Sequence, residues 1–300
     1  MASPAAPSES ARSGGARRWL ALCLMIACLA GGAVYFATQR ERLAAELAFT
    51  PLWLVPLALA EAALLVLRGA LLLRLCRALE VRLSWREAIG LQAGSLLANY
   101  LVPGLGGTSL RAAYLKGRHE LPLAAFAGLL AATYLLQYLV ICGLGLGVSL
   151  LLPELQDAVR WIIALALLGV GLLGLVTFLQ PFGAPASSGR VSRFLSSAFT
   201  GWRAMRRAGL TAPLLLAAGQ LAATASAFAC AFAVLGRSLR PLQALFVAVL
   251  AEGSILVNLT PAGLGVVESA AGLAAFLLGI PVPLAVAATA LRRAVNLLLA

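Results

Sequence analysis

The feature that most limits how this chain can fold is a series of apolar blocks, each about as long as a membrane is thick. Four of them are residues 51–73, 121–152, 161–179 and 210–235. A helix of about 20 apolar residues crosses the roughly 30 Å hydrocarbon core of a bilayer. Since 62% of the residues are hydrophobic and 11% are charged, against about 45–50% and about 25% in soluble domains, lipid must be the solvent for most of the chain.

We therefore predict an all-α polytopic membrane protein with about six full transmembrane helices. The remaining two spans are residues 19–39 and 281–300, and residues 1–18 form a disordered tail in this prediction. A cleaved signal peptide is the alternative interpretation of residues 19–39. We favour an uncleaved anchor because the apolar run continues to Ala37 and no clean small-x-small site follows a short core.

Two further apolar stretches, 88–110 and 242–278, are interrupted by proline and glycine. Proline removes a helical donor and glycine loosens the backbone, so each stretch is expected to form two half-helices around an irregular turn. Such backbone survives at membrane depth only where protein or a polar cavity surrounds it. We predict two re-entrant helical hairpins, which gives six to eight apparent spans. The alternative is that stretch 242–278 forms two ordinary spans. The break residues are Pro103, Gly104, Gly106, Pro261, Gly263 and Gly265.

The net charge of +12 is explained by membrane orientation, and no nucleic-acid partner is needed. Sixteen Lys and Arg residues lie in the tail before residue 19 and in segments 68–87, 111–118 and 190–207, whereas five lie in the intervening loops. Positively charged loops stay in the cytoplasm. The count predicts a multi-pass protein of the cytoplasmic membrane with a cytoplasmic N-terminus. Because both flanks of stretch 88–110 are basic, that hairpin should enter and leave from the cytoplasm.

An internal repeat divides the chain into two predicted halves, 19–152 and 153–300. Gly94, Ser95 and Asn99 recur 159 residues later as Gly253, Ser254 and Asn258, each time ahead of a Pro/Gly break. Three crossings per half is an odd number, so the second half should be inverted relative to the first. Segment 181–209 is then a basic cytoplasmic loop. Paired, interrupted segments in inverted repeats are typical of alternating-access carriers, with the site where the broken helices meet.

Charged residues inside apolar stretches cost about 2.5–3.5 kcal/mol each on insertion scales, which makes them candidates for function. We expect Glu268 to pair with Arg292. A half-helix that begins after Gly106 or Gly265 points free N–H groups into the hairpin tip, which suits an anion such as phosphate. The two asparagines could cap the loosened backbone, the more common role, or contact a headgroup. The candidate substrate-binding residues are Arg111, Glu268, Arg292, Asn99, Asn258 and Glu252.

Catalytic and metal-binding constellations are not found in the sequence. The chain has one histidine, and its five cysteines lack CxxC spacing, so no metal site or His-based nucleophile machinery is expected. No phosphate-binding or dinucleotide motif occurs either. We expect no cofactor and no enzymatic activity.

Two segments resemble signatures of the family named for the transmembrane region of lysylphosphatidylglycerol synthase, also called the flippase-like family. The segment from Asn258 to Glu268, followed by Gly279-Ile-Pro and Arg292, resembles its C-terminal signature, and the segment from Pro103 to Arg111 is similar to its N-terminal one. Thr108 stands where the family has Glu, and Ala132-Thr133 stand about where it has a Glu-Arg pair.

The resemblance implies a membrane protein whose relatives move charged phospholipids between leaflets. Relatives that synthesise aminoacyl-lipids carry a separate soluble domain, and the 29 residues of segment 181–209 are too few for one. We therefore expect a flippase-like protein with membrane lipids as partners, translocating or binding a charged phospholipid or polyprenyl-lipid. The alternative is a non-catalytic accessory subunit of a lipid-modifying or glycan-assembly enzyme. A channel fits less well, because no repeated ring of ion ligands is found.

Overall fold

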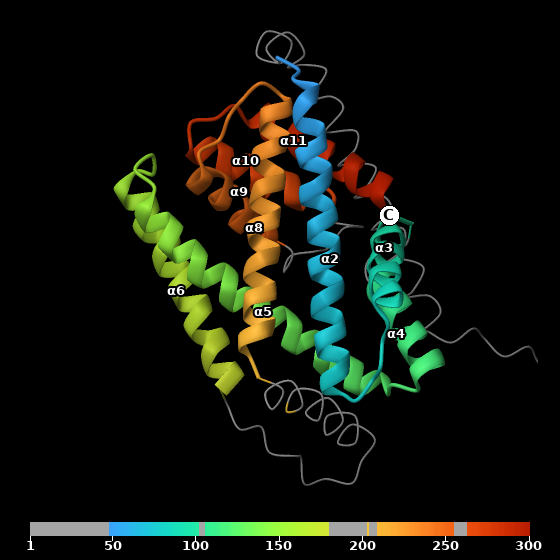
Figure 1. Cartoon of the computed structure of the whole chain (residues 1–300). Coiled ribbons are helices and arrows are strands. Elements are labelled where there is room, and N and C mark those ends of the chain that lie inside the picture. Colours follow the sequence, from blue (N-terminus) through green and yellow to red (C-terminus); the bar gives the residue numbers. More distant parts are fainter. Residues whose placement is uncertain (1–47, 102–105, 180–202, 204–208, 255–262) are drawn as a thin grey trace, which may run out of the picture.

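The computed structural model describes residues 48–101, 106–179, 203, 209–254 and 263–300, and in this part every regular element is a helix (Figure 1). A short 3-10 helix, η1, precedes the first long helix and nine α-helices follow. Their bounds are η1 Pro51–Trp53, α2 Leu54–Ala78, α3 Trp85–Leu101, α4 Gly106–His119, α5 Leu123–Leu151, α6 Asp157–Leu179, α8 Thr211–Val234, α9 Pro241–Gly253, α10 Val266–Leu277 and α11 Val282–Leu299.

Five of these helices are long and apolar enough to cross a membrane: α2 with η1, α5, α6, α8 and α11. They coincide with five of the six predicted spans, which confirms an all-α polytopic membrane protein. The sixth prediction, 19–39, lies outside the described residues, as do the tail 1–18 and nearly all of segment 181–209. Residues Pro103, Gly104, Asn258 and Pro261 also fall outside them.

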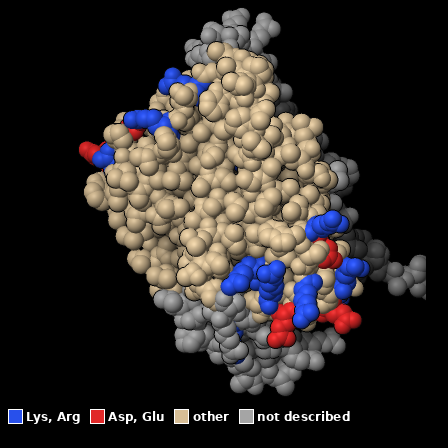
Figure 2. Space-filling view, viewed as in Figure 1, with Lys and Arg blue, Asp and Glu red and all other residues tan. Residues whose placement is uncertain are grey.

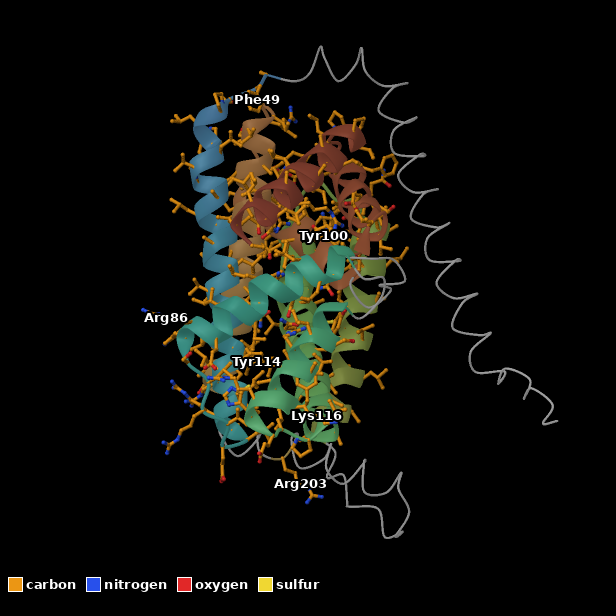
Figure 3. All side chains as sticks on the ribbon, turned by 90° about the vertical axis from the view of Figure 1, so that its right-hand side faces the viewer. Phe49, Arg86, Tyr100, Tyr114, Lys116 and Arg203 are labelled. Carbon is orange, nitrogen blue, oxygen red and sulfur yellow. The ribbon has the colours of Figure 1, made fainter. Side chains whose placement is uncertain are left out.

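The stretch 88–110 is interrupted as expected, because α3 ends at Leu101 and α4 begins at Gly106. The two helices pack against each other as a hairpin. In Figure 3, Lys116 on α4 lies toward one end of the molecule, whereas Tyr100 on α3 lies nearer its middle. A Cβ at Gly107 would overlap the carbonyl oxygen of Ser95, so only glycine permits this close approach at the hairpin tip.

The second interrupted stretch forms two short helices, α9 of 13 residues and α10 of 12 residues. At 1.5 Å per residue each is roughly 20 Å long, which is too short to cross about 30 Å of hydrocarbon. Both described helices are therefore shorter than an ordinary span, and the choice between a re-entrant hairpin and two spans stays a prediction. How either hairpin sits relative to the two membrane faces stays a prediction.

The element boundaries follow the 159-residue offset that the sequence motif predicts. Shifted by this offset, the first residues of α2, α3, α4 and α5 fall at 213, 244, 265 and 282. The helices α8, α9, α10 and α11 begin at 211, 241, 266 and 282. Each start therefore agrees within three residues. This agreement extends the similarity from one motif to four successive helices.

The paired helices α2 and α8 run antiparallel along much of their lengths. The backbone N–H of Thr50, just before η1, donates to the carbonyl of Val234 at the end of α8. Nearer the middle, the side-chain amide of Gln220 donates to the carbonyl of Leu67 at 3.3 Å. Alanines on α8 bury their small side chains in the core, which permits close helix approach in lipid. An inverted repeat requires this antiparallel course.

Charged side chains gather at the two ends of the molecule. Figure 2 shows them at opposite corners of one face, with a broad uncharged belt between. At one end, Glu154 in the α5–α6 connection forms an ion pair with Arg240 before α9. Lys116 and Arg203 mark the opposite end (Figure 3). The uncharged belt is what a membrane-embedded, multi-pass protein presents to lipid.

Glu87 fixes the open end of the first hairpin. Its carboxylate accepts hydrogen bonds from the backbone N–H of Ser84 at 2.9 Å and from the phenol of Tyr114 on α4 at 2.8 Å. Ser84 reciprocates by accepting from the N–H of Glu87, which forms a capping box. These bonds, those from Ser84 foremost, lower the pKa of Glu87 from 4.5 to about 2.

Acidification should loosen this end of the hairpin only at unusually low pH. The lowered pKa means that the Glu87 bonds stabilise the fold fully above about pH 4.5 and are lost as the pH falls through about 2. Hydrogen exchange of the segment around residues 84–88, measured at pH 6 and pH 3.5, should show retained protection in the wild type and lost protection in Glu87→Ala. Arg86→Ala, on the same turn and exposed, is the control and should behave as the wild type.

Two helix ends of the first half carry glutamate where the second half carries glycine. Glu120, after α4, has a φ of 54°, and Gly279, after α10 at the 159-residue offset, has a φ of 67°. Left-handed backbone costs an L-residue about 1–2 kcal/mol, and glycine avoids that cost. Glu80 after α2 and Gly236 after α8 show the same contrast.

Replacing Glu120 by glycine should therefore stabilise the protein by about 1 kcal/mol, or about 2 °C in the unfolding temperature. Thermal unfolding in detergent measures this gain. Glu120→Ala is the matched control, because it removes the same carboxylate but keeps a Cβ. Equal unfolding temperatures for the two variants would refute the explanation by backbone strain.

Candidate functional site

A cavity of about 330 Å³ lies between the two halves. Leucines of α2, α3 and α5 supply much of its apolar wall, and side chains from both hairpins and from α11 supply its polar part. Its volume is at the lower end of the range of ligand pockets, about 300–1,000 Å³. The polar lining includes Arg68, Gln92, Asn99, Tyr100, Arg111, Tyr134, Gln137, Gln220, Thr224, Glu252, Arg292, Arg293 and Asn296.

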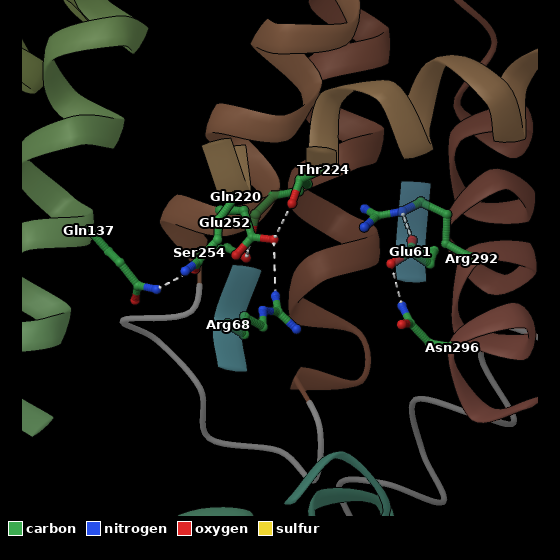
Figure 4. Close-up of polar contacts among 10 residues, drawn as sticks. Glu61, Arg68, Gln137, Gln220, Thr224, Glu252, Ser254, Arg292 and Asn296 are labelled. Carbon is green, nitrogen blue, oxygen red and sulfur yellow. Dashed lines mark hydrogen bonds and ion pairs between the residues drawn. The ribbon is translucent and has the colours of Figure 1, made fainter. Parts of the chain in front are cut away.

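Glu61 on α2 and Arg292 on α11 form a buried ion pair beside the cavity (Figure 4). The Nε of Arg292 lies 2.6 Å from the Glu61 carboxylate, and the amide of Asn296 donates to its other oxygen at 2.8 Å. The guanidinium also stacks over Phe228 of α8, 4.1 Å from the ring centroid. Since Glu61 is fully buried, this pair ties together α2, α8 and α11.

The expected pairing of Glu268 with Arg292 is wrong. Glu268 pairs with Arg293 at 2.6 Å, because consecutive helix residues point about 100° apart and only Arg293 faces α10. Glu268 also accepts from the N–H of Gly265 at 2.8 Å and so caps α10.

Arg293 connects the two hairpins. Its guanidinium donates to the carbonyl of Gly263, in the second break, at 3.2 Å and to the phenol of Tyr100, near the end of α3, at 3.4 Å. The interrupted ends of both hairpins thus meet at one side chain. The sequence placed the candidate site where the broken helices meet, and the cavity lies beside this contact.

A third ion pair, between Arg68 on α2 and Glu252 on α9, is looser than the other two. The closest nitrogen and oxygen are 3.7 Å apart, and the side chains remain 34% and 21% exposed. At that distance no direct hydrogen bond joins them. Thr224 donates to the same Glu252 oxygen at 3.1 Å. Both charged groups line the cavity, so a bound molecule can reach them.

Arg111 on α4 differs from the other arginines that line the cavity. Among the described residues no carboxylate forms an ion pair with it, and its buried Nε has no hydrogen-bond partner there. Tyr134 and Arg68 line the same cavity as Arg111. A buried donor without a partner is rare in proteins and needs an explanation.

The other candidates have structural contacts as well as places in the cavity wall. Asn99 accepts from the N–H of Gly107 at 2.7 Å, so it caps the start of α4, the role that we considered more common for this residue type. Arg292 is held by Glu61 and Phe228. Among the candidates that line the cavity, Arg111 therefore stands out because no carboxylate in the described part of the chain pairs with it, and Glu252 stands out because its ion pair is the loosest of the three.

The 159-residue offset also relates two hydrogen bonds at the centre of the molecule. Asn296 of α11 donates to Glu61 of α2, and Gln137 of α5 donates to Gln220 of α8 at 2.9 Å. Glu61 corresponds to Gln220, and Gln137 corresponds to Asn296. Each bond joins the helix before the hairpin of one half to the helix after the hairpin of the other, as pseudo-twofold symmetry requires.

Sequence reasoning did not assign Glu61, Arg68 or Arg293 to the site. Glu61 and Arg68 are seven residues apart on one helix, and we counted Arg68 only among the basic residues of segment 68–87. One sequence signal points to these residues: Glu61 and Gln220 are polar and lie at equivalent positions of the two halves. Detecting it requires aligning the whole apolar stretches of the two halves at the 159-residue offset.

Breaking the buried pair from one side should destabilise the protein more than removing both charges. Arg292→Met leaves Glu61 charged in the core, at a cost of about 3–5 kcal/mol. The double variant Glu61→Gln/Arg292→Met should recover much of this loss. Unfolding temperatures in detergent measure both effects. If the double variant is less stable than Arg292→Met alone, the pair does not act as described.

Comparison with known proteins identifies the family. The family model described as the lysylphosphatidylglycerol synthase TM region matches residues 18–300. A search of curated proteins gives no match. The family match covers the described helices on both sides of the cavity, including both hairpins, in agreement with the resemblance of the two Pro/Gly segments. The chain therefore belongs to the family of the lysylphosphatidylglycerol synthase transmembrane region.

Proposed function

We propose that this protein binds a lipid by its phosphate-containing headgroup in the cavity and moves that lipid between the leaflets of the cytoplasmic membrane. The single observation that carries the proposal is Arg111, a cation in the cavity wall without a carboxylate partner among the described residues. Such a charge inside a membrane protein is expensive unless an anion neutralises it. Phosphate is the anion that nearly all membrane lipids carry.

The composition of the cavity wall supports a lipid ligand. Apolar side chains such as Leu64, Leu71 and Leu129 share the wall with arginine, tyrosine and amide groups. A headgroup and the first part of an acyl chain present the same combination of polar and apolar surface. The family description names a membrane region of a lipid synthase, which agrees with a lipid as ligand.

The orientation in the membrane is part of the proposal. The first hairpin opens toward the end that carries Lys116 and Arg203 (Figure 3), and basic residues favour the cytoplasm. We place that end, and the N-terminus, on the cytoplasmic side, with the first hairpin re-entrant from the cytoplasm and the second from the opposite face. Binding and translocation without covalent chemistry is sufficient for this function, so we assign no enzymatic activity.

The test is lipid movement in reconstituted vesicles. Vesicles that contain the full-length protein should exchange a tail-labelled phospholipid between leaflets faster than empty vesicles. Arg111→Ala should slow the exchange about ten- to hundredfold, because a charge-assisted hydrogen bond contributes about 1.5–3 kcal/mol. Circular dichroism and size-exclusion elution check that the variant folds.

Lys116→Ala is the matched control, since Lys116 lies on the same helix, is exposed and is not part of the cavity wall. It removes one positive charge and should leave the rate unchanged. Equal rates for empty vesicles and vesicles with the wild-type protein would overturn the proposal. In that case the accessory role beside a lipid-modifying or glycan-assembly enzyme becomes the better hypothesis.

A further inference from the structure

The charges around the cavity do not cancel. Four arginines line it, and three glutamates pair with three of them, which leaves one net positive charge among the described residues. The break segments 102–105 and 255–262, which lie outside those residues, contain no ionisable side chain. These two segments therefore add no charge to that of the described wall.

The surplus charge can be located within the first half. Glu61 and Glu268 each lie 2.6 Å from their arginine and accept a further hydrogen bond. The charges of these two pairs therefore cancel within each pair. The group that remains consists of Glu252, Arg68 and Arg111. Glu252 faces Arg68 at 3.7 Å, and Arg68 and Arg111 place two like charges in the wall of the same cavity.

The repeat explains why the first half has this surplus. Arg293, which neutralises Glu268 in the second half, corresponds to Tyr134 in the first at the 159-residue offset. Glu268 itself corresponds to Ser109, and Arg111 corresponds to Ala270. The first half thus has a cation on its hairpin and no acid to oppose it. A ligand can supply the missing negative charge.

Resting on the proposed function, we infer that the cavity selects headgroups with a single net negative charge and that Arg68 and Arg111 hold the phosphate between them. Glu252, Arg68, the phosphate and Arg111 then alternate in sign and sum to zero. Arg68 has donors enough to bridge Glu252 and a phosphate oxygen, since guanidinium carries five N–H groups. A zwitterionic headgroup leaves one positive charge uncompensated, and a dianion leaves one negative charge.

Headgroup selectivity in vesicles tests this inference. The probes share one labelled acyl chain and differ in headgroup: phosphoglycerol with one negative charge, phosphocholine with none, and a phosphate monoester. At about pH 8 the monoester is a dianion, since its second pKa is about 6. The membrane potential is held at zero with valinomycin and equal potassium on both sides. The wild type should move phosphoglycerol at least tenfold faster than either other probe.

Two variants should change the order of preference in opposite directions. Arg111→Gln makes the group neutral. In this variant the phosphocholine probe should therefore move faster than the phosphoglycerol probe. Glu252→Gln raises the group to two positive charges, so the monoester should gain at least tenfold relative to phosphoglycerol. Lys116→Gln and Glu80→Gln make the same charge changes at exposed positions outside the cavity wall and should preserve the wild-type order.

The outcomes separate this inference from the proposed function. If the wild type moves labelled lipids but the order of the three probes is the same in all variants, the charge selectivity is refuted and lipid translocation stands. If the wild type moves no probe faster than empty vesicles, both are refuted. If Lys116→Gln reverses the headgroup preference, exposed charges outside the cavity determine the selectivity. That result would also overturn the assignment to Arg68 and Arg111.

Discussion

An ionised side chain in hydrocarbon costs about 2.5–3.5 kcal/mol on insertion scales, and seven such side chains meet around the cavity of this protein. Six of them form three ion pairs, each between different helices. Glu61 and Arg292 join α2 to α11, Glu268 and Arg293 join α10 to α11, and Arg68 and Glu252 join α2 to α9. The positions of these helices therefore depend on the need to neutralise buried charge. In lipid, where apolar burial does not drive helices together, such contacts have added importance.

The pseudo-twofold arrangement is regular in its backbone and irregular in its charges. Helix starts agree within three residues after the 159-residue shift, and the bonds of Asn296 to Glu61 and of Gln137 to Gln220 are equivalent. The charged residues do not follow this symmetry, since the second half has an acid and a base where the first has Ser109 and Tyr134. The two halves thus share their packing and differ in the charges that they bring to the cavity.

Much of the fold could be predicted from hydrophobicity alone, and part of the site could not. Apolar length identified five described spans within a few residues, and the Pro/Gly breaks located the gap after Leu101 and the short helices α9 and α10. Arg111 and Glu252 were found because charge in an apolar block is conspicuous. The partner of Arg292 was predicted wrongly, since Arg292 and Arg293 are adjacent in sequence and only the rotation of α11 decides which of them faces Glu268 and which faces Glu61.

The sequence by itself determined that the chain is helical and embedded in a membrane, where its helices are interrupted, and that it repeats at an offset of 159 residues. Apolar length and Pro/Gly breaks depend on residues close together in the chain, and the repeat is found by comparing two segments of sequence, so none of these properties requires knowing which side chains touch. The tertiary structure alone decided which charges neutralise each other and which one is left over. Glu61 and Arg292 are 231 residues apart, and no local pattern encodes their contact. The surplus at Arg111 is likewise a property of the assembled helices, because it appears only once every other cation of the cavity has found its carboxylate.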